Sequence, residues 1–480
     1  MGNGMLTFQD LQKVGESDKD RMAFVKSVIN RHKGTELYKM ACVAEEYDRQ
    51  QNRTIMLFRK LLYTVTGAAV PDNYSADYKL CSNFFDRLIT QLNQYLLGNG
   101  CTWGDQKTKE KLGKDFDTRL QQAGHEALMS GEAFGFWNLE HLEVFNLREF
   151  APLYDEENGA LSAGVRFWQI DSNKPMRATL YELDGYTDYQ FENGEGTVLH
   201  EKRDYIIEST GAPVDEALSY QGKNYDGFPI IPLWANQHKQ SELVGMRENI
   251  DAYDLIKSGF ANTVDDASMI YWTISNAGGM DEVDLAHFVD SLRRVKAATV
   301  GKQGQAEAHT MDVPYASREA ILDRLRNDIY EDFMALDTKT IAAGAVTATQ
   351  IKAAYEPINS KADKFEYQVL DFIQGILRIA GIEDSPTFNR SMITNTNEEI
   401  QILLQSAQYL PEKYITKKIV ALLGDSEALK DIEKMKDEEN MDRLTPEDEE
   451  EEELPEPAGF IGKGEPLTAE ELESRNETMR

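Results

Sequence analysis

Two helical apolar stripes, separated by a short segment of small residues, occupy the Arg318–Gly381 stretch. The first stripe runs from Ile321 to Phe333 and repeats about every four residues, which predicts an amphipathic helix. The second predicts a helix over 350–380, roughly 45 Å long at about 1.5 Å per residue. Its apolar positions are Ile351, Tyr355, Ile358, Ala362, Phe365, Val369, Phe372, Ile376 and Ile379.

The segment between these helices, 338–349, is small, nearly uncharged and contains one glycine, Gly344. Such a segment can bend or slide but buries little surface. Pro357 predicts a kink within the second helix, and Gly381 predicts its end. A helix this long with a break before it is more than a small core needs. By itself, the pattern also fits a helical hairpin in a large α-rich enzyme.

The composition makes the chain strongly acidic. It contains 51 Lys and Arg against 83 Asp and Glu, a net charge of −32. This argues against a basic surface that grips duplex DNA. It does not exclude a cavity through which DNA passes without adhering, because like charges repel. A chain of 480 residues is also expected to form several domains or subdomains.

Cysteine usage and hydropathy indicate the compartment. Cys42, Cys81 and Cys101 have no paired spacing, which fits synthesis in a reducing cytosol. No run of about 18 apolar residues is present, so no membrane-spanning helix and no membrane partner are expected.

Residues 1–70 have mostly helical spacing, and two further helical patterns follow before residue 131. We expect helices over 18–33, 35–49, 81–97 and 107–130, the last ended by Gly131.

From 132 to 236 the pattern changes to short stretches rich in aromatic and β-branched residues. The turn pairs Asn158-Gly159, Asp184-Gly185 and Asn193-Gly194 separate several of them. This predicts a β-rich domain that closes with an extended segment at 227–232. The predicted strands are 134–137, 142–145, 163–170, 177–183, 186–191, 197–200 and 205–208.

Helical spacing returns at 241–267, with Ser241 as a candidate N-cap. An insert, 268–314, interrupts two helices that are expected to lie side by side. It should contain a strand, a helix over 283–292, a strand over 295–300 and a last extended piece.

The C-terminal part is expected to begin with a strand near 387–393. Three helices should follow, over about 398–409, 411–423 and 426–436. From 437 the chain is highly acidic, with an unbroken acidic run at 447–453, and is expected to be disordered. This tail would either keep the protein soluble or dock basic partners.

The sequence contains no motif that would carry catalysis. It lacks a Gly-rich phosphate loop with Lys-Ser/Thr, a G-x-S-x-G elbow, an H-E-x-x-H pattern and a His/Cys cluster. The seven histidines are scattered, which is typical of structural or exposed positions. We therefore expect no enzyme, no cofactor and no metal site.

Acidic pairs are the remaining chemical candidates, although 83 carboxylates form such pairs by chance. The Asp265-Asp266 pair and the acidic residues of 281–284 could bind a divalent ion through oxygen ligands. Asp251 and Asp254, three apart on one helix, are expected to be solvated or paired across a subunit boundary.

Four stretches of the chain carry a resemblance to a known family. Together and in this order they resemble the tailed-phage portal proteins of the siphophage type, over about residues 35–400. A departure is Ala345–Ala348, where the family more often has a Ser-Gly-like pair. The four stretches are Tyr78–Phe85 continuing to Tyr95–Asn99, Ala151–Asp155 followed by Ala163–Arg166, Ile231–Asn236 continuing through Ser241 and Glu242 to Ile250–Asp254 with Ser258 and Asn262, and Ala343–Lys364.

The resemblance implies an α+β, portal-type fold. This fold has a helical wing containing a β domain, a two-helix stem, a small α/β clip, a long kinked helix after a tunnel loop, and a helical crown. The implied divisions are an N-terminal segment 1–34, wing 35–240 with its β-rich part about 132–236, stem 241–267 and 317–337, clip 268–316, tunnel loop 338–349, long helix and return strand 350–396, crown 397–436 and tail 437–480.

The resemblance also implies a function and a set of partners. The expected assembly is a closed homo-oligomeric ring of about twelve copies at one capsid vertex of the virion. Double-stranded DNA would pass through it during packaging and ejection, after synthesis of the protein in the host cytoplasm. The clip would face the terminase motor and later the head–tail adaptor. Scaffold and major capsid proteins are the other expected partners.

Two groups of functional residues follow from this arrangement. Every charge in a ring is multiplied by the copy number, so Lys339 and Lys352 would form positive rings that face DNA. They could instead point to solvent or pair with Glu356 or Asp337. The expected channel residues are Lys339, Thr340, Ala343, Gly344, Ala345, Val346, Thr347 and Lys352, and the expected clip docking residues are Tyr271, Trp272, Arg293, Arg294 and Lys296.

Two alternatives remain open on the sequence. An acidic scaffold or adaptor protein, which binds basic partners without forming a channel, would explain the tail but not the helix–break–helix stretch. A metal-dependent enzyme would explain the carboxylates, and it would require a divalent ion for activity.

Overall fold

The computed structural model divides the chain into two compact units, 1–394 and 395–480, and mixes helices with antiparallel sheets. The residues that it describes are 4–63, 68–72, 76–192, 194–210, 219–267, 271–275, 283–284, 287, 305–309, 315–339, 348–390, 396–409 and 411–422.

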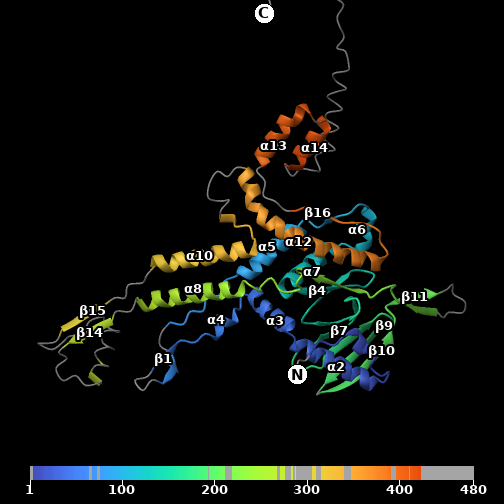
Figure 1. Cartoon of the computed structure of the whole chain (residues 1–480), viewed down its shortest axis with the longest axis horizontal. Helices are drawn as coiled ribbons and strands as arrows, with labels where there is room; N and C mark the ends of the chain where they lie inside the picture. Colours follow the sequence, from blue (N-terminus) through green and yellow to red (C-terminus); the bar gives the residue numbers. More distant parts are fainter. Residues whose placement is uncertain are drawn as a thin grey trace, which may run out of the picture. The chain divides into compact units, whose positions relative to one another are not determined.

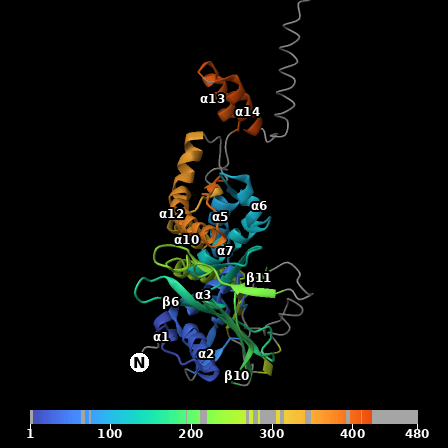
Figure 2. The ribbon, with the colours of Figure 1, turned by 90° about the vertical axis from the view of Figure 1, so that its right-hand side faces the viewer.

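The N-terminal helices α1 (Phe8–Gln12) and α2 (Asp18–Gly34) lie on a five-stranded sheet. The Ser17 hydroxyl caps α2 by accepting a hydrogen bond from the Asp20 amide at 3.2 Å. Val28 and Ile29 of α2 are buried against this sheet (Figure 2). Helices α1 and α2 therefore share a hydrophobic core with the five-stranded sheet.

Five further helices complete the first half of the helical framework. Their bounds are α3 (Glu36–Asp48), α4 (Arg53–Leu57), α5 (Phe84–Leu97), α6 (Gln106–Leu112) and α7 (Phe116–Ser130). The single helix expected over 107–130 is wrong. Gly113 has a φ of 83°, outside the helical region, so the chain turns there and α7 starts anew at Phe116. Gly131 ends α7 in the left-handed conformation, as predicted.

The β-rich region forms two sheets and a hairpin. The five-stranded antiparallel sheet has the order β10-β9-β8-β7-β6, and a three-stranded sheet has the order β13-β4-β5. Aromatic rings of Phe134, Phe145 and Phe150 pack between them. The strands are β4 (Glu132–Trp137), β5 (Leu142–Asn146), β6 (Phe150–Tyr154), β7 (Leu161–Trp168), β8 (Met176–Glu182), β9 (Gly185–Glu192), β10 (Glu195–Arg203), β11 (Ile206–Thr210), β12 (Ser219–Lys223) and β13 (Ile230–Trp234).

The long helix α12 (Ala348–Ala380) packs across the three-stranded sheet and buries its predicted stripe. Two glycines permit this close approach. A Cβ atom on Gly375 would lie 2.7 Å from the Ile231 side chain, and one on Gly135 would lie 2.4 Å from the Phe372 ring. The helix is continuous through Pro357 and changes direction along its length (Figure 1), as an internal proline predicts.

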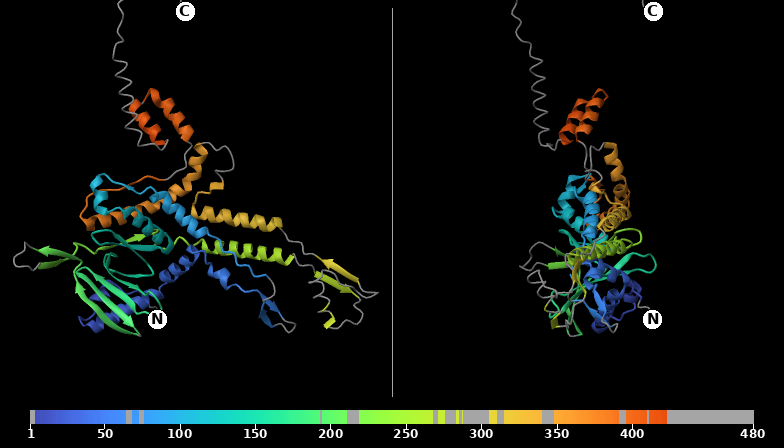
Figure 3. Two further views of the ribbon diagram at one scale, coloured as in Figure 1. Left: turned by 180° about the vertical axis from the view of Figure 1, so that it is seen from behind. Right: turned by 90° about the vertical axis from the view of Figure 1, so that its left-hand side faces the viewer.

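Helices α8 (Arg247–Ala267) and α10 (Tyr315–Phe333) lie side by side, as expected (Figures 1 and 3). The strands β14 (Tyr271–Ser275) and β15 (Gln305–His309) pair antiparallel in the segment that connects them. Of the helix expected over 283–292, only residues 283, 284 and 287 are described. The strand expected over 295–300 lies outside the described residues.

Helix α8 begins six residues later than the sequence predicts. Ser241 is buried, and its hydroxyl donates to the Met129 carbonyl at 2.5 Å and accepts from the Leu243 amide at 3.1 Å. The hydroxyl therefore joins residues 242–246 to the end of α7 instead of capping α8.

Short strands complete the first unit: β1 (Leu61–Tyr63) pairs with β2 (Ala69–Pro71), and β3 (Cys101–Thr102) pairs with β16 (Thr387–Phe388). The second unit contains α13 (Thr396–Gln405), the 3-10 turn η1 (Ser406–Gln408) and α14 (Glu412–Leu422). The expected helix at 426–436 and the tail 437–480 lie outside the described residues. None of the helices in the described ranges is long and apolar enough to cross a membrane.

Candidate channel and subunit-docking surfaces

The end of α10 is fixed firmly to the rest of the subunit. Met334 adopts a φ of 63°, and the Ala335 amide donates to the Tyr330 carbonyl at 2.9 Å, which closes the helix in a Schellman arrangement. The side-chain amide of Gln91 on α5 then makes two hydrogen bonds with the backbone of Leu336, at 3.0 and 3.2 Å. This clamp sets the point from which the predicted tunnel loop departs.

Asp337 receives a second anchor from α10. The Arg326 guanidinium donates two hydrogen bonds of 2.8 Å to its carboxylate, and this interaction holds the pKa of Asp337 below its ordinary value. Lys339 follows, exposed, and its backbone amide donates to the same carboxylate at 3.0 Å. Because Arg326 occupies Asp337, the Lys339 ammonium makes no ion pair within the described ranges.

The start of α12 is exposed before it enters the core. Lys352 is exposed, whereas Tyr355 and Ile358 are buried. The Lys352 side chain makes no ion pair with Glu356 or with any other described residue. Lys339 and Lys352 therefore stand at the two described edges of the break. The remaining predicted channel residues, Thr340, Ala343, Gly344, Ala345, Val346 and Thr347, lie outside the described residues.

A half-buried lysine, Lys361, joins α12 to the segment before α8 and to the end of α10. The Lys361 ammonium lies 2.6 Å from Glu242, just before α8, and 3.5 Å from the ring centre of Phe333, the last residue of α10. Burial lowers the pKa of Lys361, while the ion pair with Glu242 opposes that shift. This contact could not be predicted from the sequence, because Glu242, Phe333 and Lys361 are far apart in the chain.

The predicted clip residues are only partly described. Tyr271 and Trp272 lie on β14, opposite His309 and Ala308 of β15. Arg293, Arg294 and Lys296 lie outside the described residues.

Helix α8 binds a distant segment through three buried polar residues spaced four apart, Asp254, Ser258 and Asn262. Their side chains accept hydrogen bonds from the backbone amides of alternate residues: Ser82 at 2.9 Å, Leu80 at 3.0 Å and Tyr78 at 2.6 Å. Four helical residues rise about 6 Å and two extended residues about 6.6 Å, so the two repeats match.

The expectation that Asp251 and Asp254 are solvated or paired across a subunit boundary is wrong. Asp254 is fully buried and also accepts from Asn52 at 3.0 Å, and burial raises its pKa. Asp251 accepts from the Tyr47 hydroxyl and from Thr54. We call the hydrogen bonds of Asp254, Ser258 and Asn262 to residues 78–82 the polar ladder. The four-residue spacing of these polar side chains on α8 is the signal that could have revealed it.

One group of described residues is close enough to share a metal ion: Asp48, Asp86 and His125, whose ligand atoms lie within 4.8 Å of one another. In the structure, Asp48 and the His125 Nε2 atom are 3.1 Å apart, and this contact raises the pKa of His125. The contact between Asp48 of α3 and His125 of α7 accounts for this group without a metal ion. Of the acidic residues singled out from the sequence, Asp265 and Asp284 belong to no such group; the side chain of Asp266, and Asp281 and Glu282, are not described.

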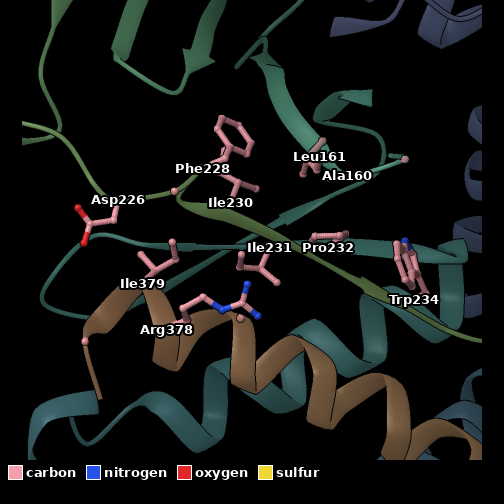
Figure 4. Close-up of a pocket in the computed structure, with 14 residues that line it drawn as sticks. Ala160, Leu161, Asp226, Phe228, Ile230, Ile231, Pro232, Trp234, Arg378 and Ile379 are labelled. Carbon is pink, nitrogen blue, oxygen red and sulfur yellow. The ribbon is translucent and has the colours of Figure 1, made fainter. Parts of the chain in front are cut away.

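A cavity of about 540 Å³ lies between β13, the β6–β7 turn and the end of α12 (Figure 4). Its walls are mainly apolar, with Ile231 and Pro232 above the Arg378 side chain and Asp226 at one end. The lining residues include two charged side chains, Asp226 and Arg378. The residues that line the cavity are Gly159, Ala160, Leu161, Asp226, Gly227, Phe228, Ile230, Ile231, Pro232, Trp234, Gly375, Arg378, Ile379 and Gly381.

A buried carboxyl group lies beside this cavity. Glu132 of β4 accepts hydrogen bonds from the Trp234 Nε1 atom at 2.8 Å and from the Tyr154 hydroxyl. Burial raises the pKa of Glu132 to about 7, although the Trp234 bond and the nearby Lys239 ammonium both oppose the shift. The two hydrogen bonds of Glu132 join β4 to β13 and β6.

Comparison with known proteins identifies the family. The family described as phage portal protein, SPP1 Gp6-like, matches residues 43–442. The chain therefore belongs to this family of phage portal proteins.

Two relatives and two solved structures illustrate the similarity. The chain is 24% identical over 375 residues to the portal protein of Clostridium phage phiCD119, covering 71% of this chain and 81% of the relative. It is 23% identical over 381 residues to the portal protein of Bacillus phage SPP1, covering 72% and 73%. Chains in the neck of an empty gene-transfer-agent particle and in the native particle each align with a TM-score of 0.43 and 10% identity. They cover 71% of this chain and 90% and 89% of those chains, respectively.

Proposed function

We propose that this protein forms a closed ring at one capsid vertex, through which DNA is packaged and ejected. The observation that carries the proposal is the family match over residues 43–442, which spans α8, β14, β15, α10 and α12 in their order along the chain. This match favours a portal over the acidic adaptor and the metal-dependent enzyme. Portal proteins are structural proteins, and translocation would be driven by a separate ATPase.

In this proposal the described elements take the parts of a portal subunit. Helices α8 and α10 form the stem, and the β14–β15 hairpin belongs to the clip that docks the terminase motor and the head–tail adaptor. Residues 338–349 form the tunnel loop, with α12 behind it. The helices α13 and α14 belong to the crown. The side-by-side packing of α8 and α10, and their connection through a paired hairpin, support this division.

Lys339 and Lys352 are the residues that we propose to face DNA. Both are exposed, and the anchored residues Leu336 and Asp337 before the loop and the buried Tyr355 after it support this assignment. With about twelve copies, each lysine would contribute a ring of about twelve positive charges in a channel of an otherwise acidic protein.

Electron microscopy of the purified full-length chain tests the ring. End-on views should show closed rings of about twelve subunits with a central hole. Monomers that persist at high concentration and in the presence of scaffold protein would contradict the proposal and favour an acidic adaptor.

Charge reversal tests the two channel lysines. Lys339→Glu with Lys352→Glu should leave ring assembly intact and reduce the amount of DNA packaged per particle, because the two rings of positive charge become negative and repel the phosphates. Lys107→Glu with Lys111→Glu, at two exposed positions on α6, is the control that makes the same change of net charge. Normal packaging by the double variant would remove these lysines from the channel.

A further inference from the structure

We propose that a segment which we call the strap, residues 53–82, docks on the outer face of α10 of the neighbouring subunit. The inference rests on the proposed ring and names two surfaces that would meet in it. It is drawn from the described parts of the strap, which are 53–63, 68–72 and 76–82.

The strap is held firmly but leaves large apolar side chains in solvent. The polar ladder on α8 binds its C-terminal part, and the Lys79 ammonium donates to the carbonyls of Met56 and Phe58 at 3.0 and 2.9 Å. Nevertheless Leu57 is 70% exposed and Phe58 is 48% exposed. A fixed backbone that presents apolar side chains to water is typical of a surface that a partner covers.

The strap and α10 lie on opposite sides of α8. The strap contacts α8 at Asp254, Ser258 and Asn262, whereas Arg318 of α10 donates to the Thr263 hydroxyl at 2.9 Å. At about 100° per residue, position 263 is about 180° from position 254 around the helix axis. Figures 1 and 3 show α8 between α10 and α4, the first part of the strap.

Opposite surfaces on one subunit are what a closed ring requires. Each copy in a ring meets one neighbour through one surface and the other neighbour through a different surface. The outer face of one subunit's α10 and the strap of the next are therefore free to meet, since neither surface is used by the contact with α8.

The strap and α10 differ in the sign of their net charge. The strap contains four basic residues, Arg53, Arg59, Lys60 and Lys79, and two acidic residues, so its net charge is 4 − 2 = +2 in a chain of net charge −32. Helix α10 contains three arginines and five acidic residues, a net charge of 3 − 5 = −2. Its exposed positions include Glu319, Asp323 and Glu331.

The outer face of α10 also offers an apolar contact for the strap. Ile321 is 48% exposed at the outer end of the apolar stripe, and the exposed Ala316 and Ala320 lie on a second face, about 100° to 140° around the helix from it. Small residues allow a neighbouring backbone to approach closely. Leu57 and Phe58 of the strap would cover Ile321, with Arg59 facing the acidic side chains of α10.

Chemical cross-linking tests the contact directly. The variant Phe58→Cys with Ile321→Cys, in a background where Cys42, Cys81 and Cys101 are alanine, would be treated with a short bismaleimide after ring assembly. A link within one chain would leave the protein at the size of a monomer, so only links between chains can produce a ladder. We expect a ladder of covalent oligomers, whereas either single variant should stop at dimers. The pair Phe58→Cys with Ile170→Cys, whose second site is exposed on the β7–β8 turn, is the matched control.

A second measurement keeps the native cysteines, so it does not depend on the cysteine-free background. Phe58→Asp should leave the melting temperature of the isolated subunit within about 2 °C, because the side chain is already exposed, and should reduce the fraction of subunits in rings at least tenfold. Ile170→Asp should change neither quantity.

The possible failures can be told apart. If wild-type protein forms no rings, the proposed function and the docking contact both fail. If wild-type rings form but Phe58→Asp assembles normally and the cysteine pair gives no ladder, only the strap contact is overturned, and another surface closes the ring.

Discussion

Helices α10 and α12 carry apolar stripes of the same kind, yet they are buried to different degrees. On α12, Tyr355, Phe365 and Phe372 are at most 2% exposed. On α10, Ile329 and Phe333 are fully buried, whereas Ile321, two turns earlier in the same stripe, is 48% exposed. The stripe on α12 faces the core of its own subunit along almost its whole length. The stripe on α10 is buried in that core only over the last turns of the helix, and its earlier part lies outside the core.

This difference shows that an amphipathic stripe does not reveal which molecule covers it. Helix α12 packs against β13, β4 and α5, so its partners belong to the same chain. The first part of α10 extends beyond that core beside α8, and a subunit in a ring can cover it instead. The stability of the subunit should therefore depend on α12 and the stability of the ring on the outer part of α10.

The largest expected effect separates the two stripes directly. Phe365→Ala should lower the free energy of unfolding of the subunit by about 3–5 kcal/mol, because it leaves a cavity in the central core. Ile321→Ala should change it by less than about 0.5 kcal/mol, because that side chain is already half exposed. Urea unfolding of each variant measures both values. Equal losses would show that the outer part of α10 is buried within its own subunit, as the stripe of α12 is.

The next prediction concerns the sheet on which α12 packs. Burial raises the pKa of Glu132 from its ordinary value of 4.5 to about 7 in the folded state. The folded carboxyl therefore keeps its proton where the unfolded one loses it. Its contribution to stability is full below about pH 4.5, declines as the pH rises through 7, and amounts to at most about 3 kcal/mol.

Glu132→Gln isolates this contribution. The variant keeps an oxygen that can accept from Trp234 but cannot ionise, so its free energy of unfolding should change less between pH 5 and pH 8 than that of the wild type. Paired urea titrations at the two pH values measure the difference. If the two proteins lose the same stability over this interval, the Glu132 carboxyl is not the titrating group.

The smallest expected effect tests the clamp that ends the buried part of α10. Gln91→Ala removes two hydrogen bonds to the Leu336 backbone and should cost about 1–2 kcal/mol. Hydrogen exchange should increase at Leu336 and Asp337 more than in the body of α12. Gln122→Ala, at an exposed position on α7, is the control. Uniform exchange in the variant would mean that other contacts hold this segment.

Helix ends show where prediction from the sequence succeeds and where it fails. Gly381 predicts the end of α12, because glycine adopts the positive φ of 65° that the helix end requires. Helix α10 ends in the same Schellman arrangement at Met334, whose φ is 63°. Methionine has no intrinsic preference for a positive φ, so the sequence does not predict this helix end. The packing around Leu336 and Asp337 determines it. Conversely, Gly113 interrupts a helical pattern that the sequence reads as continuous.

The candidate site divides in the same way. The family resemblance implied that Lys339 and Lys352 face DNA. Both are exposed, as a channel position requires; Lys339 lies at the start of the predicted tunnel loop and Lys352 lies near the start of α12. Their contact with DNA stays a prediction. The ladder on α8 was not foreseen, because its partners are separated by more than 170 residues in the chain.

The sequence by itself determined the local structure and the class of protein. Its apolar periods predicted α2, α3, α10 and α12, its Asn-Gly and Asp-Gly pairs marked hairpins, and its ordered motifs indicated a portal. Only the tertiary structure decided which stripe is buried and which acidic residues on α8 serve as hydrogen-bond acceptors for the strap. The reason is physical: periodicity fixes what a segment can form locally, whereas burial depends on partners that the chain brings together from far apart.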